Sequence, residues 1–133
     1  MNMIGMLKMV YEDSYLRMVY EDNYMDFYDQ VNLPVYHLYS GDDVKLFYEN
    51  NKAKITNEVF DGIKFMLREQ LIEYPVFKLD IGGRMARILI TRDKIDLLLE
   101  ECIKNYEEVE DYERCASALE LIHDNPGGDV KVK

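Results

Sequence analysis

Cysteine and positive charge are both scarce in this chain, and long uncharged runs are absent. Its 133 residues include two cysteines, Cys102 and Cys115, which suits a reducing compartment better than a disulfide-stabilised scaffold. The longest run without Asp, Glu, Lys or Arg spans residues 30–41, far short of the roughly 20 apolar residues of a membrane-spanning helix. The chain begins without a basic region, an apolar stretch and a cleavage site in succession, so we expect a cytoplasmic protein with no signal peptide.

Basic residues are outnumbered, because 16 lysines and arginines stand against 26 aspartates and glutamates, giving a formal net charge of −10. This excess repels phosphate groups, which argues against direct nucleic-acid binding and against adhesion to anionic membranes. The acids gather at two places: residues 1–30 hold six acids and two bases, and residues 91–124 hold 11 acids and four bases. Such clustering is typical of solvated helix faces or of a surface that attracts a basic partner.

The composition predicts one folded domain of the α+β class over residues 1–124, followed by a flexible tail at 125–133. Apolar residues make up 48% of the chain, which is ordinary for a globular domain. The tail begins with the helix-breaking segment Asn125-Pro126-Gly127-Gly128. The predicted domain consists of two β-hairpins, a central amphipathic helix and a C-terminal pair of antiparallel helices.

A hairpin is predicted around Gly82-Gly83, because two glycines between alternating apolar runs are typical of a two-residue turn. Closing the turn there sets three opposing pairs, namely Ile81 with Arg84, Leu79 with Ala86 and Phe77 with Ile88. The alternation then places six apolar side chains on one buried face of the hairpin. These are Phe77, Leu79, Ile81, Ala86, Ile88 and Ile90.

Three helices are predicted in the second half of the chain. The central one covers about residues 57–74, where apolar residues recur at helical spacing, with Thr56 as its cap and Pro75 after its end. Two more helices, at about 91–106 and 111–124, follow the hairpin and form an antiparallel pair. In the last helix the residues expected to be buried are Tyr112, Cys115, Ala116, Leu119 and Ile122.

The first half of the chain carries weaker signals. Residues 35–39 suit a strand. Residues 44–48 and 52–55 are predicted to pair as a second hairpin, about a turn at Glu49-Asn50-Asn51. Residues 12–30 fit either a long helix or strands separated by Glu-Asp turns, and we favour the helix.

A short repeat lies within the first 30 residues. The pattern Met-Val-Tyr-Glu-Asp-x-Tyr occurs at residues 9–15 and again at 18–24, an offset that cannot place both copies on one face of a straight helix or strand. The two copies could be adjacent strands of a meander, and we favour a duplication without a repeated site. The stretch is still rich in tyrosine, methionine and acids. Tyrosine and methionine combine apolar area with a polar tip or with adaptability, as protein interfaces require.

The last two predicted helices contain Asp111-Tyr112-Glu113-Arg114-Cys115-Ala116 and then Ile122, an acid–aromatic–Glu–basic–small–small pattern. In these residues the hairpin resembles the UVR motif, through which nucleotide-excision-repair subunits associate. The likeness covers about residues 91–124, and the Leu-Arg-Asp core of the motif is replaced by Ala118-Leu119-Glu120. The resemblance implies a hairpin that contacts another protein, and it does not assign the chain to that family.

No residue pattern predicts catalysis, a metal site or a cofactor. His37 and His123 have no Cys or His neighbour at metal-ligand spacing, and the two cysteines lack an activating base. Gly82-Gly83 is followed by a predicted strand, whereas a phosphate-binding glycine loop precedes a helix. Carboxylates are so abundant that no acid–base pair stands out. We therefore expect a protein that is not an enzyme.

The preferred hypothesis is a protein that binds a protein partner with a basic surface and regulates or inhibits it. Small size and acidity would also fit a phage-encoded host-takeover or anti-defence factor. Two alternatives remain open: a DNA mimic with carboxylates along one continuous face, and a self-assembling, homo-oligomeric structural protein. The residues predicted to bind the partner are Tyr11, Tyr15, Tyr20, Glu21, Asp22, Tyr24, Asp26, Tyr28, Glu107, Glu108, Glu110 and Asp111.

Overall fold

The computed structural model describes residues 15–21 and 32–124. Within these ranges the strands are β1 (Arg17–Tyr20), β2 (Val35–Leu38), β3 (Glu73–Ile81) and β4 (Arg84–Thr91). The helices are α2 (Val44–Asn50), α3 (Lys52–Glu69), α4 (Ile95–Glu108) and α5 (Tyr112–Asp124). Two short 3-10 turns, η2 (Gly41–Asp43) and η3 (Arg92–Lys94), lead into α2 and α4. The predicted α+β class is confirmed, as is a strand within the predicted range 35–39, where β2 ends at Leu38.

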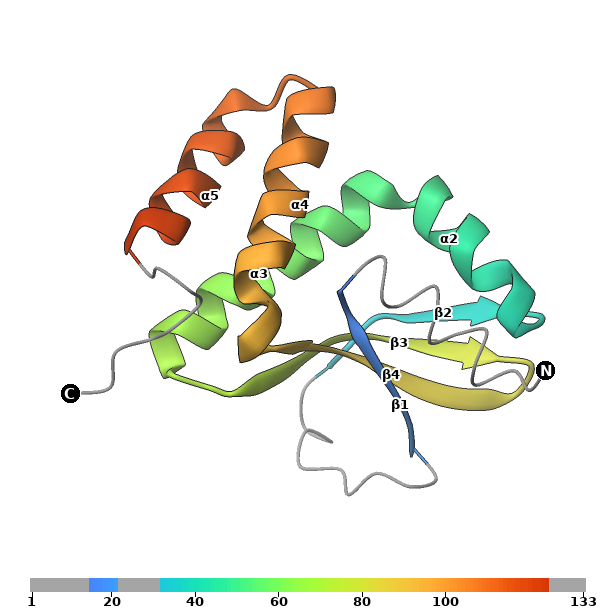
Figure 1. The fold of residues 1–133 in the computed structure, drawn as a ribbon. Helices are drawn as coiled ribbons and strands as arrows, with labels where there is room; N and C mark the ends of the chain where they lie inside the picture. The colour runs from blue at the N-terminus through green and yellow to red at the C-terminus, as the bar shows by residue number, and fades with distance from the viewer. Residues whose placement is uncertain (1–14, 22–31, 125–133) are drawn as a thin grey trace.

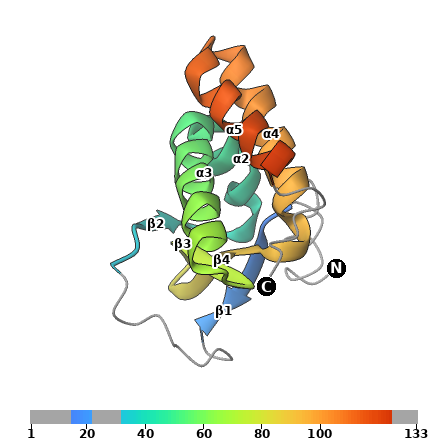
Figure 2. The ribbon, with the colours of Figure 1, turned by 90° about the vertical axis from the view of Figure 1, so that its left-hand side faces the viewer.

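The four strands form one sheet in the order β1-β4-β3-β2, with β1 and β2 at its edges. β3 and β4 make an antiparallel hairpin, β1 adds antiparallel to β4, and β2 runs parallel to β3. A parallel neighbour requires a crossover, which α2 and α3 supply between β2 and β3. The helices lie on one side of the sheet (Figure 1), and the view turned by 90° shows the same layering (Figure 2).

The β3–β4 hairpin has the predicted turn and register. Gly82 and Gly83 form the turn with φ values of 59° and 90°, which glycine adopts without a Cβ clash. All three predicted pairs are present across the two strands. The six side chains assigned to the buried face of the hairpin are each at most 3% exposed. Local turn chemistry and alternation were therefore sufficient to predict this element.

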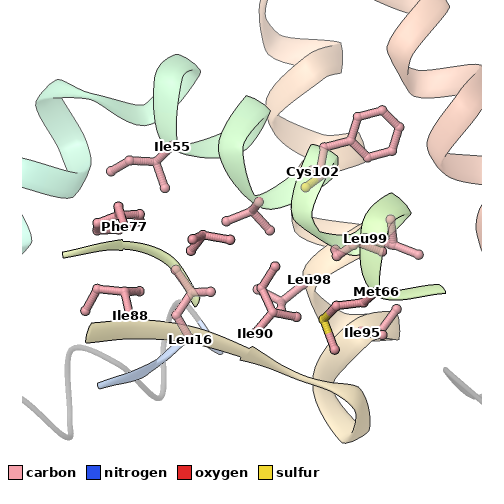
Figure 3. Packing of buried hydrophobic residues seen from close by; sticks show 14 of the residues in the cluster. Leu16, Ile55, Met66, Phe77, Ile88, Ile90, Ile95, Leu98, Leu99 and Cys102 are labelled. Carbon is pink, nitrogen blue, oxygen red and sulfur yellow. The ribbon is translucent and has the colours of Figure 1, made fainter. Parts of the chain in front are cut away.

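The hydrophobic core fills the space between the hairpin and the helices. Apolar side chains from α3, α4 and the strands converge there, among them Met66, Ile90 and Leu99, none of which is exposed (Figure 3). At the β2 end of the core, the rings of Phe47 and Phe77 lie with their centroids 6.2 Å apart. This packing anchors α3 and α4 to the sheet. None of the described helices is long and apolar enough to cross a membrane.

Residues 44–50 and 52–55 are helical, so the second predicted hairpin is wrong, and the described chain has β3–β4 as its single hairpin. The carboxylate of Asp43 accepts a hydrogen bond from the backbone N–H of Ser40 at 3.3 Å. This Ser-x-x-Asp arrangement is a helix-start signal, and it outweighs a short alternating pattern. Val44 and Phe47 are three residues apart and both buried, as the inner face of an amphipathic helix requires.

The central helix is confirmed with different ends. α3 begins at Lys52, and after Glu69 the chain leaves the helix through Gln70, whose φ of 56° is left-handed. Thr56 therefore lies inside the helix and does not cap it. Its hydroxyl donates a hydrogen bond to the Lys52 carbonyl, one turn earlier, at 2.6 Å. Pro75 lies within β3, beside an irregularity in the pairing with β4.

The predicted helix over residues 12–30 is wrong at residues 17–20, which form the strand β1. These residues pair with β4, and Tyr20 lies opposite Ala86. Pairing with a strand more than 60 residues away thus decides a segment whose local pattern was ambiguous. Residues 12–14 and 22–30 lie outside the described residues, as does the predicted tail at 125–133.

Candidate interaction site

The α4–α5 pair confirms the predicted C-terminal helical hairpin, and α5 is its outer member. α5 packs along α4 and makes few contacts with any other element. α4 in turn packs against α3, which rests on the sheet. Both ribbon views place α5 at the outside of the helical layer (Figures 1 and 2). Much of the surface of α5 therefore faces away from the fold.

α5 leaves three apolar side chains at the surface, and we call Tyr112, Ala116 and Leu119 the α5 stripe. Tyr112 is 62% exposed and Leu119 is 56% exposed, and Ala116 between them is also exposed. Residues four and seven positions apart lie on one side of a helix, so the three form a continuous row. The prediction that these three residues are buried is wrong.

A different side of α5 is buried against α4. Cys115 and Ala118 are buried, and the Cys115 thiol donates a weak hydrogen bond to the Ile103 carbonyl at 3.5 Å. The helix thus carries apolar residues on two adjoining sides, and α4 covers one of them. Periodicity alone could not tell which side packs inward, because both sides satisfy helical spacing.

Four of the predicted partner-binding acids lie where α4 meets α5: Glu107 and Glu108 end α4, and Glu110 and Asp111 lie in the turn that follows. Asp111 caps α5, since its carboxylate accepts a hydrogen bond from the backbone N–H of Arg114 at 3.2 Å and pairs with the guanidinium at 2.8 Å. Hydrogen bonds from Arg114 lower the pKa of Asp111. Glu108 pairs with Lys52 of α3 at 3.1 Å. Within the part of the chain that the structure describes, Glu107 and Glu110 form no ion pair.

An exposed apolar residue also belongs to this turn. Val109 is 63% exposed and lies between Glu108 and Glu110. Glu110 has a φ of 59°, the left-handed geometry that reverses the chain after α4. The acidic turn and the α5 stripe thus occupy one hairpin, and they place apolar area and carboxylates next to each other.

A furrow runs along the side of α4 that faces α3. Two hollows of about 340 and 310 Å³ lie next to each other there, because Lys52, Thr56 and Asn105 line both. The Asn105 amide donates to the Thr56 hydroxyl at 3.0 Å, and the Tyr106 hydroxyl donates to the Asn57 side chain at 2.8 Å. These polar groups of the furrow satisfy one another's hydrogen bonds.

The predicted site residues near the N-terminus that the structure describes lie at or next to β1, and not at the α4–α5 hairpin. Tyr20 is only 8% exposed, and the Arg84 guanidinium lies 3.7 Å from the centre of its ring. Tyr15 is half-buried. Glu21 pairs with Lys78 and Arg87 on the sheet, and β1 lies away from the α4–α5 turn in both ribbon views (Figures 1 and 2). The remaining members lie outside the described residues: Tyr11, Asp22, Tyr24, Asp26 and Tyr28.

Burial governs the chemistry of the two thiols. Cys102 is 3% exposed, and burial raises its pKa to about 12. Burial, followed by the charges of Glu107 and Asp111, also raises the pKa of Cys115. Thiols held in their protonated form are poor nucleophiles. Among the described residues, no group of three or more His, Cys, Asp or Glu side chains could hold a metal ion.

A small titratable cluster joins β2 to α3. The Tyr36 hydroxyl donates to the Glu58 carboxylate at 3.0 Å, and the Lys54 ammonium lies 4.8 Å from the centre of the Tyr36 ring. Burial raises the pKa of Glu58, which the Tyr36 hydrogen bond and the Lys54 charge oppose. The described hollows are not lined by these residues, so we assign the cluster a structural role.

Comparison with known proteins finds no matching family model, no similar curated protein and no similar solved structure. The candidate site therefore rests on the geometry of the α4–α5 hairpin.

Proposed function

We propose that this chain is a non-enzymatic cytoplasmic protein that docks its α4–α5 hairpin on a basic surface of a protein partner and so regulates or inhibits it. One observation carries the proposal. The outermost helical hairpin bears exposed Val109, Tyr112 and Leu119 beside the exposed acids Glu107, Glu110 and Glu113. Apolar side chains surrounded by charge are the usual composition of a specific, non-obligate protein interface.

The two kinds of side chain have different tasks in such an interface. Removing Tyr112 and Leu119 from water would supply affinity, at about 1.5–3 kcal/mol for a side chain of this size that is fully buried. The carboxylates would attract a basic partner over several ångströms and favour one orientation of it. Inhibition then follows by covering the partner's basic surface. This is how a phage-encoded host-takeover or anti-defence factor could act.

The DNA-mimic alternative requires the acids of both chain ends to share one face. Of the acids in residues 1–30, Glu21 is the one that the structure describes. Its carboxylate pairs with Lys78 and Arg87 at the sheet, away from the α4–α5 turn. A self-assembling structural role would bring together copies of a segment with 11 acids and four bases. We therefore prefer a basic protein partner to either alternative.

The test compares two variants that remove equal charge from different places. The hairpin variant carries Glu107→Gln, Glu110→Gln and Glu113→Gln. The control variant carries Asp42→Asn, Glu69→Gln and Asp93→Asn, which are exposed acids away from the α4–α5 turn. Immobilised full-length chain is used to capture proteins from candidate host lysates, and the captured proteins are quantified by mass spectrometry.

We expect a protein with a basic surface to be enriched by the parent and by the control variant. The hairpin variant should retain roughly a tenth of it or less, which corresponds to about 1.4 kcal/mol. Enrichment should fall as salt is raised. Equal loss with both variants, or no protein above background with the parent, would overturn the proposal.

A further inference from the structure

The α5 stripe has the spacing and side-chain sizes of a groove that packs against another helix. Tyr112 and Leu119 lie about 10 Å apart along the helix axis, seven residues at 1.5 Å each. Ala116 between them is small, so the stripe forms a shallow notch between two larger side chains. Helices pack by inserting the side-chain ridge of one into such a groove of the other, with contacts at three- and four-residue spacing.

Carboxylates border the α5 stripe on its solvent side. Glu113 and Glu120 each follow one stripe residue in sequence, and both are exposed. They are seven residues apart, so they form a second row parallel to the stripe and about 100° round the helix. Within the described residues neither takes part in an ion pair.

Carboxylates border the stripe on its α4 side as well. Cys115 is buried between α5 and α4, one turn from both Tyr112 and Leu119, and its thiol donates to the Ile103 carbonyl of α4 at 3.5 Å. Glu107 follows Ile103 by one turn, so it lies on the side of α4 that faces α5. Glu100 is exposed and seven residues earlier, which places it on the same side of α4 as Glu107.

This charge pattern selects the occupant. A second copy of the chain would bring acidic rows against acidic rows, and like charges facing each other in an interface are unfavourable. A helix with an apolar face and lysines or arginines along both borders of that face would match the stripe and neutralise both rows. It would also bury Tyr112 and Leu119, and it would lie beside α5 as the third helix of a bundle.

We infer that the α5 stripe binds a basic amphipathic helix of the partner, an inference that rests on the proposed function and specifies how the partner binds. The helix lies along α5 with its apolar side chains against Tyr112, Ala116 and Leu119. Its basic side chains face Glu107 on one border and Glu113 and Glu120 on the other.

The experiment uses the full-length chain labelled with ¹⁵N and three synthetic peptides of about 18 residues, roughly five helical turns. The first peptide places leucines at helical spacing among lysines. The second keeps those leucines and replaces each lysine by glutamate. The third has the composition of the first with leucine and lysine in strict alternation, which favours a strand. Amide shifts and affinities are measured by NMR titration at low and moderate salt.

We expect the helical Leu/Lys peptide alone to bind tightly, to shift the amides of Tyr112, Ala116 and Leu119 most, and to weaken as salt rises. Leu119→Ser should weaken binding roughly tenfold. Leu46→Ser on α2 is the matched control, because Leu46 is 55% exposed and Leu119 is 56% exposed. The control should bind with unchanged affinity.

Three results would overturn the inference: equal binding of the alternating peptide, shifts centred away from the stripe, or equal loss with both serine variants. Stripe shifts that grow with protein concentration in the absence of peptide would identify a second copy as the occupant instead. If Leu119→Ser retains the captured partner while the hairpin variant loses it, the proposed function stands and the helix-binding mode falls. If the hairpin variant retains the partner, the proposed function itself fails.

Discussion

The carboxylate of Glu21 lies 3.1 Å from the guanidinium of Arg87, and the same oxygen lies 3.0 Å from the Lys78 ammonium. Arg87 is fully buried, so this acid at the end of β1 compensates a base that water does not reach. The pair joins β1 to the β3–β4 hairpin. It also explains how Glu21 can belong to an acidic segment of the sequence without adding to an acidic surface.

Replacing Glu21 should destabilise the fold. Glu21→Gln removes the charge that compensates Arg87, and we expect a loss of about 1–3 kcal/mol. This is less than for a fully buried pair, because the Glu21 side chain is 29% exposed. Glu69→Gln is the control, since its partner Arg68 is 70% exposed, and it should change stability by less than about 0.5 kcal/mol. Urea unfolding followed by circular dichroism measures both, and equal effects would contradict this account of Glu21.

Gly62 allows α3 to approach the sheet closely. A Cβ at this position would lie 2.8 Å from Val76 Cγ1 and 2.9 Å from Ile90 Cδ1. We expect Gly62→Ala to destabilise the protein by about 1 kcal/mol, because overpacking outweighs the better helix propensity of alanine. Ile90→Val removes the clashing Cδ1, so the double variant should lose less than the sum of the two single losses. A stabilised Gly62→Ala variant would show that α3 can shift freely.

The two thiols should resist alkylation in the folded protein. With a pKa of about 12, Cys102 is ionised to only about one part in 10⁴ at pH 8, and it is 3% exposed. Cys115 is 7% exposed, with its pKa also raised by burial. We expect iodoacetamide to modify neither residue over minutes in the native state and both in concentrated urea, as counted by mass spectrometry. Rapid native labelling of Cys102 would contradict its described burial.

The Tyr36–Glu58 link should make stability depend on pH. Because burial raises the pKa of Glu58, the folded state holds its proton more tightly than the unfolded state does. The stabilising contribution is therefore complete below the ordinary pKa of 4.5 and is lost as pH rises through the folded value. Glu58→Gln keeps an acceptor for Tyr36 and does not titrate, so its melting temperature should rise relative to the parent between about pH 4 and pH 7.

A second variant checks the physical cause of that dependence. Tyr36→Phe removes the hydrogen bond that favours the Glu58 carboxylate, so the loss of stability with rising pH should become larger than in the parent. Thermal unfolding at both pH values measures the difference. A constant offset between Glu58→Gln and the parent at the two pH values would show that Glu58 does not titrate abnormally.

The accuracy of the sequence predictions follows the range of the interactions involved. Gly82 and Gly83 set the hairpin register through contacts between near neighbours, so turn chemistry and alternation predicted it. Residues 44–55 also follow a local helix signal, the Ser40–Asp43 helix start, which the alternating pattern of these residues does not reflect. β1 had no sufficient local signal, since its strand form depends on pairing with β4.

The predictions for the candidate site depend on the range of the interactions in the same way. The density of acids in the sequence predicts Glu107, Glu108, Glu110 and Asp111 as site residues, and in the structure they span the end of α4 and the turn before α5. Helical spacing predicts the α5 stripe to be buried, because Tyr112 and Leu119 satisfy the same spacing as Cys115, yet both are exposed. The useful signal would have been that α5 carries more apolar residues than one neighbouring helix can cover.

The amino-acid sequence by itself determined the α+β class, the β3–β4 hairpin with its register, the C-terminal helical pair and the concentration of acid in that pair. Each of these depends on residues close together along the chain. Only the tertiary structure decided that residues 17–20 are an edge strand, that Glu21 is compensated by Arg87, and that the side of α5 carrying Tyr112 and Leu119 faces outward. These depend on which distant segments meet, and local preference has too little energy to decide that.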